Sequence, residues 1–232
     1  MHHQDVVERP IGQWVAVQGQ HEPIEPQLGK PSIQRRPAEP GKGAWLNYDF
    51  VPGDRVIFFD DFATEQVGNF PRRLEFEEGN MEVAEWNKTR WLRASTHSSF
   101  SISLPETLPQ KFTIEYDMYT GSAGWNSVGI VGGEPEADQT QIFMDVTNGY
   151  AGLRKYPEAT NLAMGKVEES AFGQPIHCRM LADGGYMKVY MNENRVANVP
   201  KTNFIRSNIL HFGVAANDQR PFMLANFRIA SS

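Results

Sequence analysis

From Asp49 onward, the chain alternates between short runs of β-branched and aromatic residues and clusters of turn residues. Turn signals such as EEGN, WNKT, TNGY, ADGG and MNENR recur at roughly the 8–12-residue spacing that is typical of a β-sandwich. No segment shows the hydrophobic period of an amphipathic helix of ordinary length. This pattern predicts an all-β domain.

The strands that we predict share alternating or continuous apolar character between turn signals. They are RVIFF (55–59), LEFEE (74–78), MEVAEW (81–86), RWLRAS (90–95), SFSISL (99–104), FTIEYDMYT (112–120), SVGIVG (127–132), QIFMDV (141–146), AGLRKY (151–156), IHCRMLA (176–182), YMKVYMN (186–192), ILHFGVAA (209–216) and MLANFRIA (223–230). So many strands exceed an immunoglobulin-like sandwich and favour a jelly roll of two packed antiparallel sheets. A chain of 232 residues can bury such a core without disulfides.

Residues 1–46 differ from the rest because prolines recur through them without a sustained period. Proline removes backbone donors and favours extended geometry, so we predict an extended N-terminal arm (1–46) ahead of a β-sandwich (47–232). Apolar residues also recur along the arm and need an apolar surface to cover them. The arm therefore either straps across its own sandwich or docks onto another protein subunit. The candidate partner-binding residues are Ile11, Trp14, Val17, Ile24, Leu28, Ile33 and Trp45.

Charge and composition exclude several classes of protein. The formal net charge of −6 argues against a nucleic-acid binder, which needs clustered Lys and Arg. No run of about 18 apolar residues is present, so we predict no transmembrane segment. Met1 is followed by neither a basic region nor an apolar region of a signal peptide, which indicates a cytoplasmic protein if Met1 is the native start. Cys178 is the only cysteine, and we expect a buried, inert thiol.

The segment IHCRMLADGGYMKVYMNENRVANVP is similar to the strand–turn–strand of concanavalin-like and laminin-G-like domains. The opening FFDDF, the hairpin WNKTRWLR and the closing LANFRIA fit the same pattern. Taken together, residues 48–230 resemble the concanavalin-like domain of some bacterial OmpA-type envelope proteins. This resemblance implies a periplasmic or cell-envelope location, in contrast to the cytoplasmic location that the N-terminus indicates.

The strand FTIEYDMYT alternates between a core face and an outward face. Phe112, Ile114, Tyr116 and Met118 form the first, and Thr113, Glu115, Asp117 and Tyr119 form the second. The outward face resembles the E-x-D-x-E strand of jelly-roll glycoside hydrolases, except that Tyr119 stands at the second glutamate. A retaining glycosidase needs two carboxyl groups, and a phenol does not replace the acid near neutral pH. The broken motif argues against an enzyme, and Glu115 and Asp117 are the catalytic candidates that remain.

A binding site makes smaller demands on the sequence, because sugar recognition combines an aromatic platform with a few fixed polar groups. The candidate ligand-binding residues are Tyr119, Trp125, Asn126, Tyr150 and Tyr156. A structural Ca²⁺ is the one cofactor left open, because Asp60, Asp61, Asn217 and Asp218 lie near strand ends that can meet. No other metal or cofactor is expected, since the histidines are scattered and no phosphate loop is present.

These observations leave three functions open. The first is a non-catalytic accessory or scaffolding subunit that docks onto a larger protein assembly through residues 1–46. The alternative is a carbohydrate-binding, lectin-like module of the bacterial cell envelope. The third is a jelly-roll glycoside hydrolase.

Overall fold

The structure, a computed structural model, describes residues 48–120, 126–145, 148–217, 219 and 222–232. Every strand predicted from the sequence is present, with small differences at the ends. The elements are β1 (Arg55–Asp60), β2 (Glu75–Glu78), β3 (Met81–Trp86), β4 (Thr89–Ala94), β5 (Ser98–Ser103), β6 (Lys111–Thr120), β7 (Ser127–Gly132), β8 (Gln139–Asp145), β9 (Tyr150–Tyr156), β10 (Asn161–Lys166), the 3-10 helix η1 (Glu169–Ala171), β11 (Ile176–Asp183), β12 (Tyr186–Met191), β13 (Asn194–Val199), β14 (Ile209–Ala215) and β15 (Phe222–Ser231).

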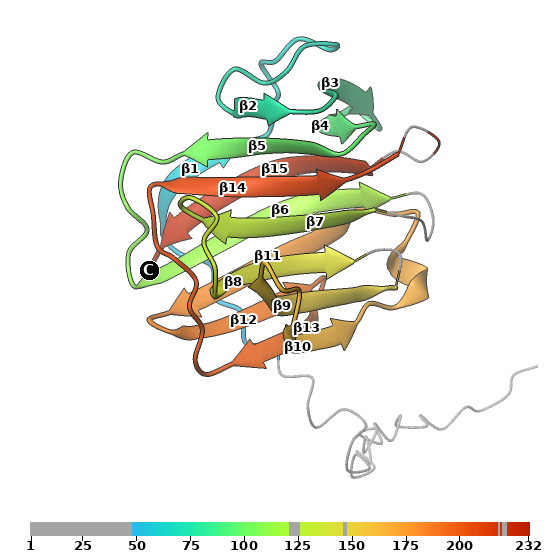
Figure 1. Ribbon diagram of the computed structural model, residues 1–232. Coiled ribbons are helices and arrows are strands. Elements are labelled where there is room, and N and C mark those ends of the chain that lie inside the picture. The colour runs from blue at the N-terminus through green and yellow to red at the C-terminus, as the bar shows by residue number, and fades with distance from the viewer. Residues whose placement is uncertain (1–47, 121–125, 146–147, 218, 220–221) are drawn as a thin grey trace, which may run out of the picture. The chain divides into compact units, whose positions relative to one another are not determined.

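The strands form two antiparallel sheets that pack face to face. The eight-stranded sheet has the order β13-β12-β11-β6-β15-β4-β3, and β1 pairs with β15. The seven-stranded sheet has the order β10-β9-β8-β7-β14-β5-β2 and lies in front of the other sheet in Figure 1. The predicted fold class, an all-β two-sheet sandwich, is confirmed.

The FTIEYDMYT strand, β6, lies in the middle of the eight-stranded sheet between β11 and β15. Its residues Phe112, Ile114, Tyr116 and Met118 are buried in the core between the two sheets, as the alternation predicts. The other four positions, which include Glu115, point away from the core. We call the surface that they share the outer face of the eight-stranded sheet.

Two strands, β10 and β13, were not predicted. The residues of β10 are exposed or half-buried throughout, so its sequence NLAMGK shows no apolar alternation. Its Gly165 reads as a turn signal, but a Cβ there would approach the carbonyl oxygen of Val196 in β13 to 2.5 Å. The glycine therefore permits a close approach between the two sheets.

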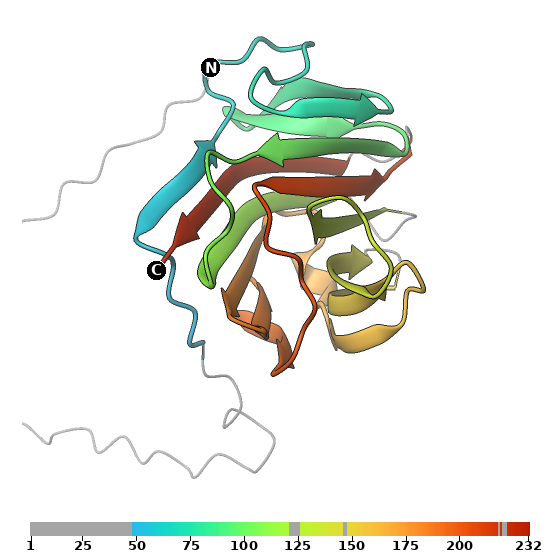
Figure 2. The ribbon, with the colours of Figure 1, turned by 60° about the vertical axis from the view of Figure 1, so that its left-hand side comes forward.

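The strand β15 pairs with three other strands. Phe222 to Leu224 pair with β4, whereas Phe227 to Ser231 pair with β1. The register with β6 shifts between Ala225 and Arg228, which marks a bulge at Asn226. Figure 2 shows β1 (blue) beside β15 (red). Thus β4 and β1 follow each other along one edge of β15, and the bulge lies between them.

The predicted arm, with all seven of its candidate partner-binding residues, lies outside the described residues. The boundary predicted at residues 46 and 47 lies outside them as well. Both stay predictions.

Candidate functional site

The outer face carries a polar cluster centred on Glu115. The β-ladders place Arg179 of β11 and Arg228 of β15 opposite this residue on either side. Arg228 donates from Nη1 to Glu115 Oε1 at 2.6 Å, while His177 Nε2 lies 3.6 Å and Arg179 Nε 4.0 Å from Oε2. Glu115 is only 8% exposed, so this carboxylate is buried among three basic side chains.

Asp117 forms the second half of the cluster. His177 lies opposite it in β11, and the imidazole Nδ1 is hydrogen-bonded to Asp117 Oδ1. Asn226 at the bulge of β15 donates from Nδ2 to Asp117 Oδ2 at 2.6 Å. The imidazole therefore bridges the two carboxylates of β6, and the bulge is what directs the Asn226 amide onto Asp117.

These contacts set the charges of the cluster. Burial opposes ionisation of Glu115, but hydrogen bonds from His177 and Arg228 outweigh it and lower the pKa of this carboxyl group. The pKa of Asp117 is lowered in the same way, since hydrogen bonds from His177 and Asn226 outweigh burial. The hydrogen bond to Asp117, with a second to Glu115, raises the pKa of His177 to about 9. Both carboxylates and the imidazole are therefore charged near neutral pH.

This electrostatic state bears on the catalytic candidates. A retaining glycosidase needs one carboxyl group whose raised pKa keeps its proton until the leaving group departs. Both Glu115 and Asp117 are shifted in the opposite direction. Each also has both of its oxygens engaged by basic or amide donors. The geometry therefore gives neither residue the properties of a glycosidase acid.

An aromatic cluster lies beside the polar cluster on the same outer face. It consists of Trp86 of β3, Trp91 of β4, Tyr119 of β6, and Met223 and Ala225 of β15. The rings of Trp86 and Tyr119 lie 4.6 Å apart and are half-buried, whereas Trp91 beneath them is 2% exposed. Trp86 and Tyr119 therefore present a partly exposed aromatic surface next to Asp117.

Another part of the outer face is covered by residues 48–54, which lead into β1; we call this segment the strap, and it is the blue coil before β1 in Figure 2. Asp49 is hydrogen-bonded to Lys188 and Tyr190 of β12, and Arg195 of β13 lies 3.2 Å from it. The bond to Lys188, with that from Tyr190, lowers the pKa of Asp49 to about 2. The strap thus begins at a charged anchor.

Two further contacts hold the strap against the sheet. The buried ring of Phe50 lies 5.4 Å from the ring of Tyr190. The Gly53 carbonyl accepts from Arg228 at 2.6 Å, and its N–H donates to Thr113 at 3.2 Å. The sheet residues that the strap contacts lie level with Glu115 or Thr113 along the β-ladders. Asp117, Tyr119 and Trp86 have no described contact with the strap.

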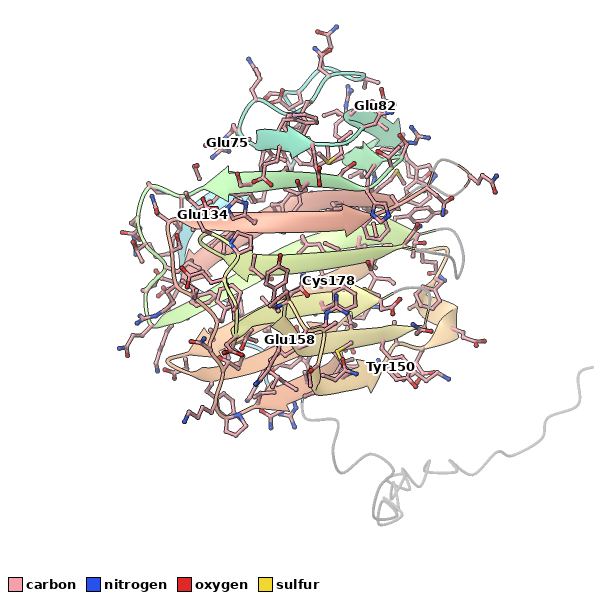
Figure 3. All side chains as sticks on the ribbon, in the orientation of Figure 1. Glu75, Glu82, Glu134, Tyr150, Glu158 and Cys178 are labelled. Carbon is pink, nitrogen blue, oxygen red and sulfur yellow. The ribbon has the colours of Figure 1, made fainter. Side chains whose placement is uncertain are left out.

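The predicted ligand-binding residues do not all come together. Tyr119 lies on the outer face, and Trp125 lies outside the described residues. Asn126 is completely buried just before β7. Tyr150 and Tyr156 belong to β9 of the seven-stranded sheet. In Figure 3, Tyr150 lies at the opposite end of the sandwich from Glu82 of β3.

The candidate calcium ligands bond to their own turns. Asp60 Oδ1 accepts from the N–H of Phe62 at 2.9 Å, and Asp61 Oδ1 from that of Ala63 at 3.0 Å. Asn217 Oδ1 accepts from the N–H of Gln219 at 3.2 Å, and Asp218 lies outside the described residues. Across the described ranges, no three His, Cys, Asp or Glu side chains form a group that could hold a metal ion. A structural Ca²⁺ stays a prediction.

Sequence reasoning missed the basic and amide partners of β6, among them His177 and Asn226. Alternation in IHCRMLA does place His177 and Arg179 on one face, opposite buried Cys178, but only the register shows which carboxylates they meet. Burial raises the pKa of the Cys178 thiol, in agreement with an inert cysteine.

Comparisons with known proteins identify the fold. No protein-family model and no curated protein matches the chain. A protein of unknown function with a galectin-like fold from Bacillus subtilis matches with a TM-score of 0.56 and 12% identity, over 78% of this chain and 98% of that chain. The carbohydrate recognition domain of Emp47p matches with a TM-score of 0.57 and 10% identity, over 79% of this chain and 100% of that chain.

A sialidase also matches with a TM-score of 0.57 and 10% identity, over 78% of this chain but only 19% of that chain. The chain therefore spans a small part of the sialidase. These matches confirm the concanavalin-like sandwich, while the resemblance to OmpA-type envelope proteins stays a prediction. No helix among the described residues is long and apolar enough to cross a membrane.

Proposed function

We propose that the protein is a carbohydrate-binding module and that its site is the uncovered part of the outer face. The observation that carries this proposal is the position of the Trp86–Tyr119 aromatic surface beside the hydrogen-bonded group of Asp117, His177 and Asn226. Sugars present apolar C–H faces and hydroxyl groups together, so a site for them needs both kinds of surface.

The two surfaces divide the recognition of a sugar ring. One pyranose face stacks on the exposed ring surface of Tyr119 or Trp86. Its hydroxyl groups reach Asp117, which keeps acceptor capacity beyond its bonds to His177 and Asn226 because a carboxylate offers about four lone-pair sites. Since these polar groups are already fixed by one another, binding does not need to order them.

The comparisons and the geometry of the outer face together favour this function over the other two. One of the matched structures is a carbohydrate recognition domain. A role as a scaffolding subunit depends on residues 1–46, which lie outside the described residues, and no comparison supports it. Hydrolysis would depend on Glu115 and Asp117, whose pKa values are lowered and whose oxygens are engaged.

A glycan array followed by calorimetric titration tests the proposal. Trp86→Leu and Tyr119→Leu should each weaken binding of the best glycan by about tenfold, because an aromatic contact is worth about 1 kcal/mol or more. Tyr150→Leu is the matched control, since this tyrosine is 42% exposed on the other sheet and should bind normally. The proposal fails if the wild-type protein binds no glycan, or if the two outer-face variants bind as tightly as the control.

A further inference from the structure

A cleft lies beside the polar cluster, at the point where β15 passes from β4 to β1. Its volume is about 410 Å³, within the range of small-molecule sites. The end of β1, the β3–β4 hairpin and the bulge of β15 line it. We call it the fork cleft and define it by Asp61, Glu85, Lys88, Thr89, Arg90 and Asn226.

Left-handed backbone gathers around the fork cleft. Phe62, Asn87, Lys88 and Asn226 have φ angles of 57°, 50°, 62° and 54°. Among the described residues only three other non-glycine residues, Asp138, Ala159 and Asn192, share this conformation. Asparagine tolerates it, but for other side chains it is strained. Strain of this kind concentrates at functional sites.

Lys88 is the informative member of this group. Asn87 and Lys88 form the two-residue turn between Trp86 and Thr89, which pair with each other. Both φ angles are positive, as in a type I′ hairpin, and the second position of that turn strongly favours glycine. The chain instead has a lysine at this position, and this lysine lines the cleft. No carboxylate of the described residues lies within ion-pair distance of its ammonium group, whereas the neighbouring Arg90 pairs with Glu85 at 3.2 Å.

The lining of the cleft indicates the class of ligand. Lys88, Thr89 and Arg90 supply donors, while Asp61, Glu85 and Asn226 supply acceptors. The two cations balance the two carboxylates, so the cleft has no net charge with which to select an ion. Such a lining suits neighbouring hydroxyl groups, each of which donates and accepts.

Asn226 connects the fork cleft to the outer face. Its Nδ2 donates to Asp117, and the same residue lines the cleft. Its amide oxygen is then the group that remains for a ligand. We propose that the fork cleft is a second subsite that holds an uncharged, hydroxyl-rich sugar residue, with Lys88 and Asn226 as its specificity-determining residues. This inference rests on the proposed function.

Lys88→Gly tests the assignment because the affinity for sugar should fall while the stability of the fold should not. Glycine removes the side chain from the cleft and also relieves the left-handed strain of the turn. We expect an unchanged or higher melting temperature, together with at least a tenfold loss of affinity for the uncharged oligosaccharide that the wild-type protein binds. A uronic-acid counterpart of that oligosaccharide should bind the wild-type protein no more tightly than the uncharged form.

Ala159→Gly is the matched control. Ala159 has a φ of 58° in the turn between β9 and β10, so glycine relieves the same strain away from the cleft. Its affinity should equal that of the wild-type protein. If Trp86→Leu weakens binding but Lys88→Gly does not, the fork cleft is no subsite although the outer-face site stands. If the wild-type protein binds no sugar, the proposed function itself fails. Tighter binding of the uronic acid would overturn the assignment of an uncharged ligand.

Discussion

Arg228 is the residue on which the order of the outer face depends most directly, and Arg228→Met removes its charge while keeping much of its apolar length. Its guanidinium group bonds both Glu115 and the Gly53 carbonyl, each at 2.6 Å. The substitution therefore removes the basic group that lies nearest to the buried Glu115 carboxylate, and it also removes one attachment of the strap.

The expected loss of unfolding free energy follows from these two contacts. A hydrogen bond to a charged group contributes about 1.5–3 kcal/mol, and breaking a buried ion pair costs about 3–5 kcal/mol. Two features reduce the effect: the Arg228 side chain is 27% exposed, and His177 still lies 3.6 Å from Glu115. We therefore expect Arg228→Met to lower the unfolding free energy by about 3 kcal/mol.

Urea unfolding followed by tryptophan fluorescence measures this loss. Arg93→Met is the matched control, because Arg93 lies 3.4 Å from Glu82 on the same sheet but both side chains are more exposed, 34% and 45%. An exposed pair contributes about 1 kcal/mol or less. In a Glu115→Gln background, Arg228→Met should cost distinctly less, since the buried charge is gone. Equal losses for Arg228→Met and Arg93→Met would refute the reasoning.

Two further predictions concern the same face. The pKa of His177 is raised to about 9, so its stabilising charge is present below its unfolded pKa near 6.5 and is lost as pH rises toward 9. Melting temperatures should fall over this range, and the fall per pH unit should be smaller in His177→Gln. An identical pH dependence in the two proteins would contradict the bridge that His177 forms between Glu115 and Asp117. A Cβ at Gly53 would meet the Ser231 carbonyl oxygen at 2.6 Å, so Gly53→Ala should destabilise the fold by about 1–3 kcal/mol. Gly213→Ala meets nothing within 4 Å and should be neutral or slightly stabilising, and equal effects of the two alanines in thermal unfolding would exclude tight packing of the strap.

The sequence predicted the face of the site but not its partners. Alternation alone placed Glu115, Asp117 and Tyr119 together on the outward side of β6, because the period of a strand is local. The residues that bond them, among them Arg228 and Asn226, come from strands far along the chain. Their meeting depends on a register that includes a bulge, and a bulge shifts every later position by one.

The same limit explains the divided ligand set. Tyr150 and Tyr119 both resemble platform residues, yet they belong to different sheets. The chain crosses between the two sheets several times, as from β6 to β7 and from β10 to β11, so nearness in sequence is a poor guide to nearness in space. Trp86 was predicted as the end of a strand and as part of a hairpin but not as a binding residue, although its ring completes the aromatic surface.

The three partners of β15 also constrain how the protein can fold. This strand pairs with β6, β4 and β1, and its register joins Val56 to Ala230. Until β15 docks, the edges of the other three strands are open, and long-range pairing of this kind is slow. The earlier strands therefore pass through a period in which unpaired edges can associate with other chains. Destabilising substitutions in β15 should consequently appear first as aggregation during refolding, before they appear as a lower melting temperature.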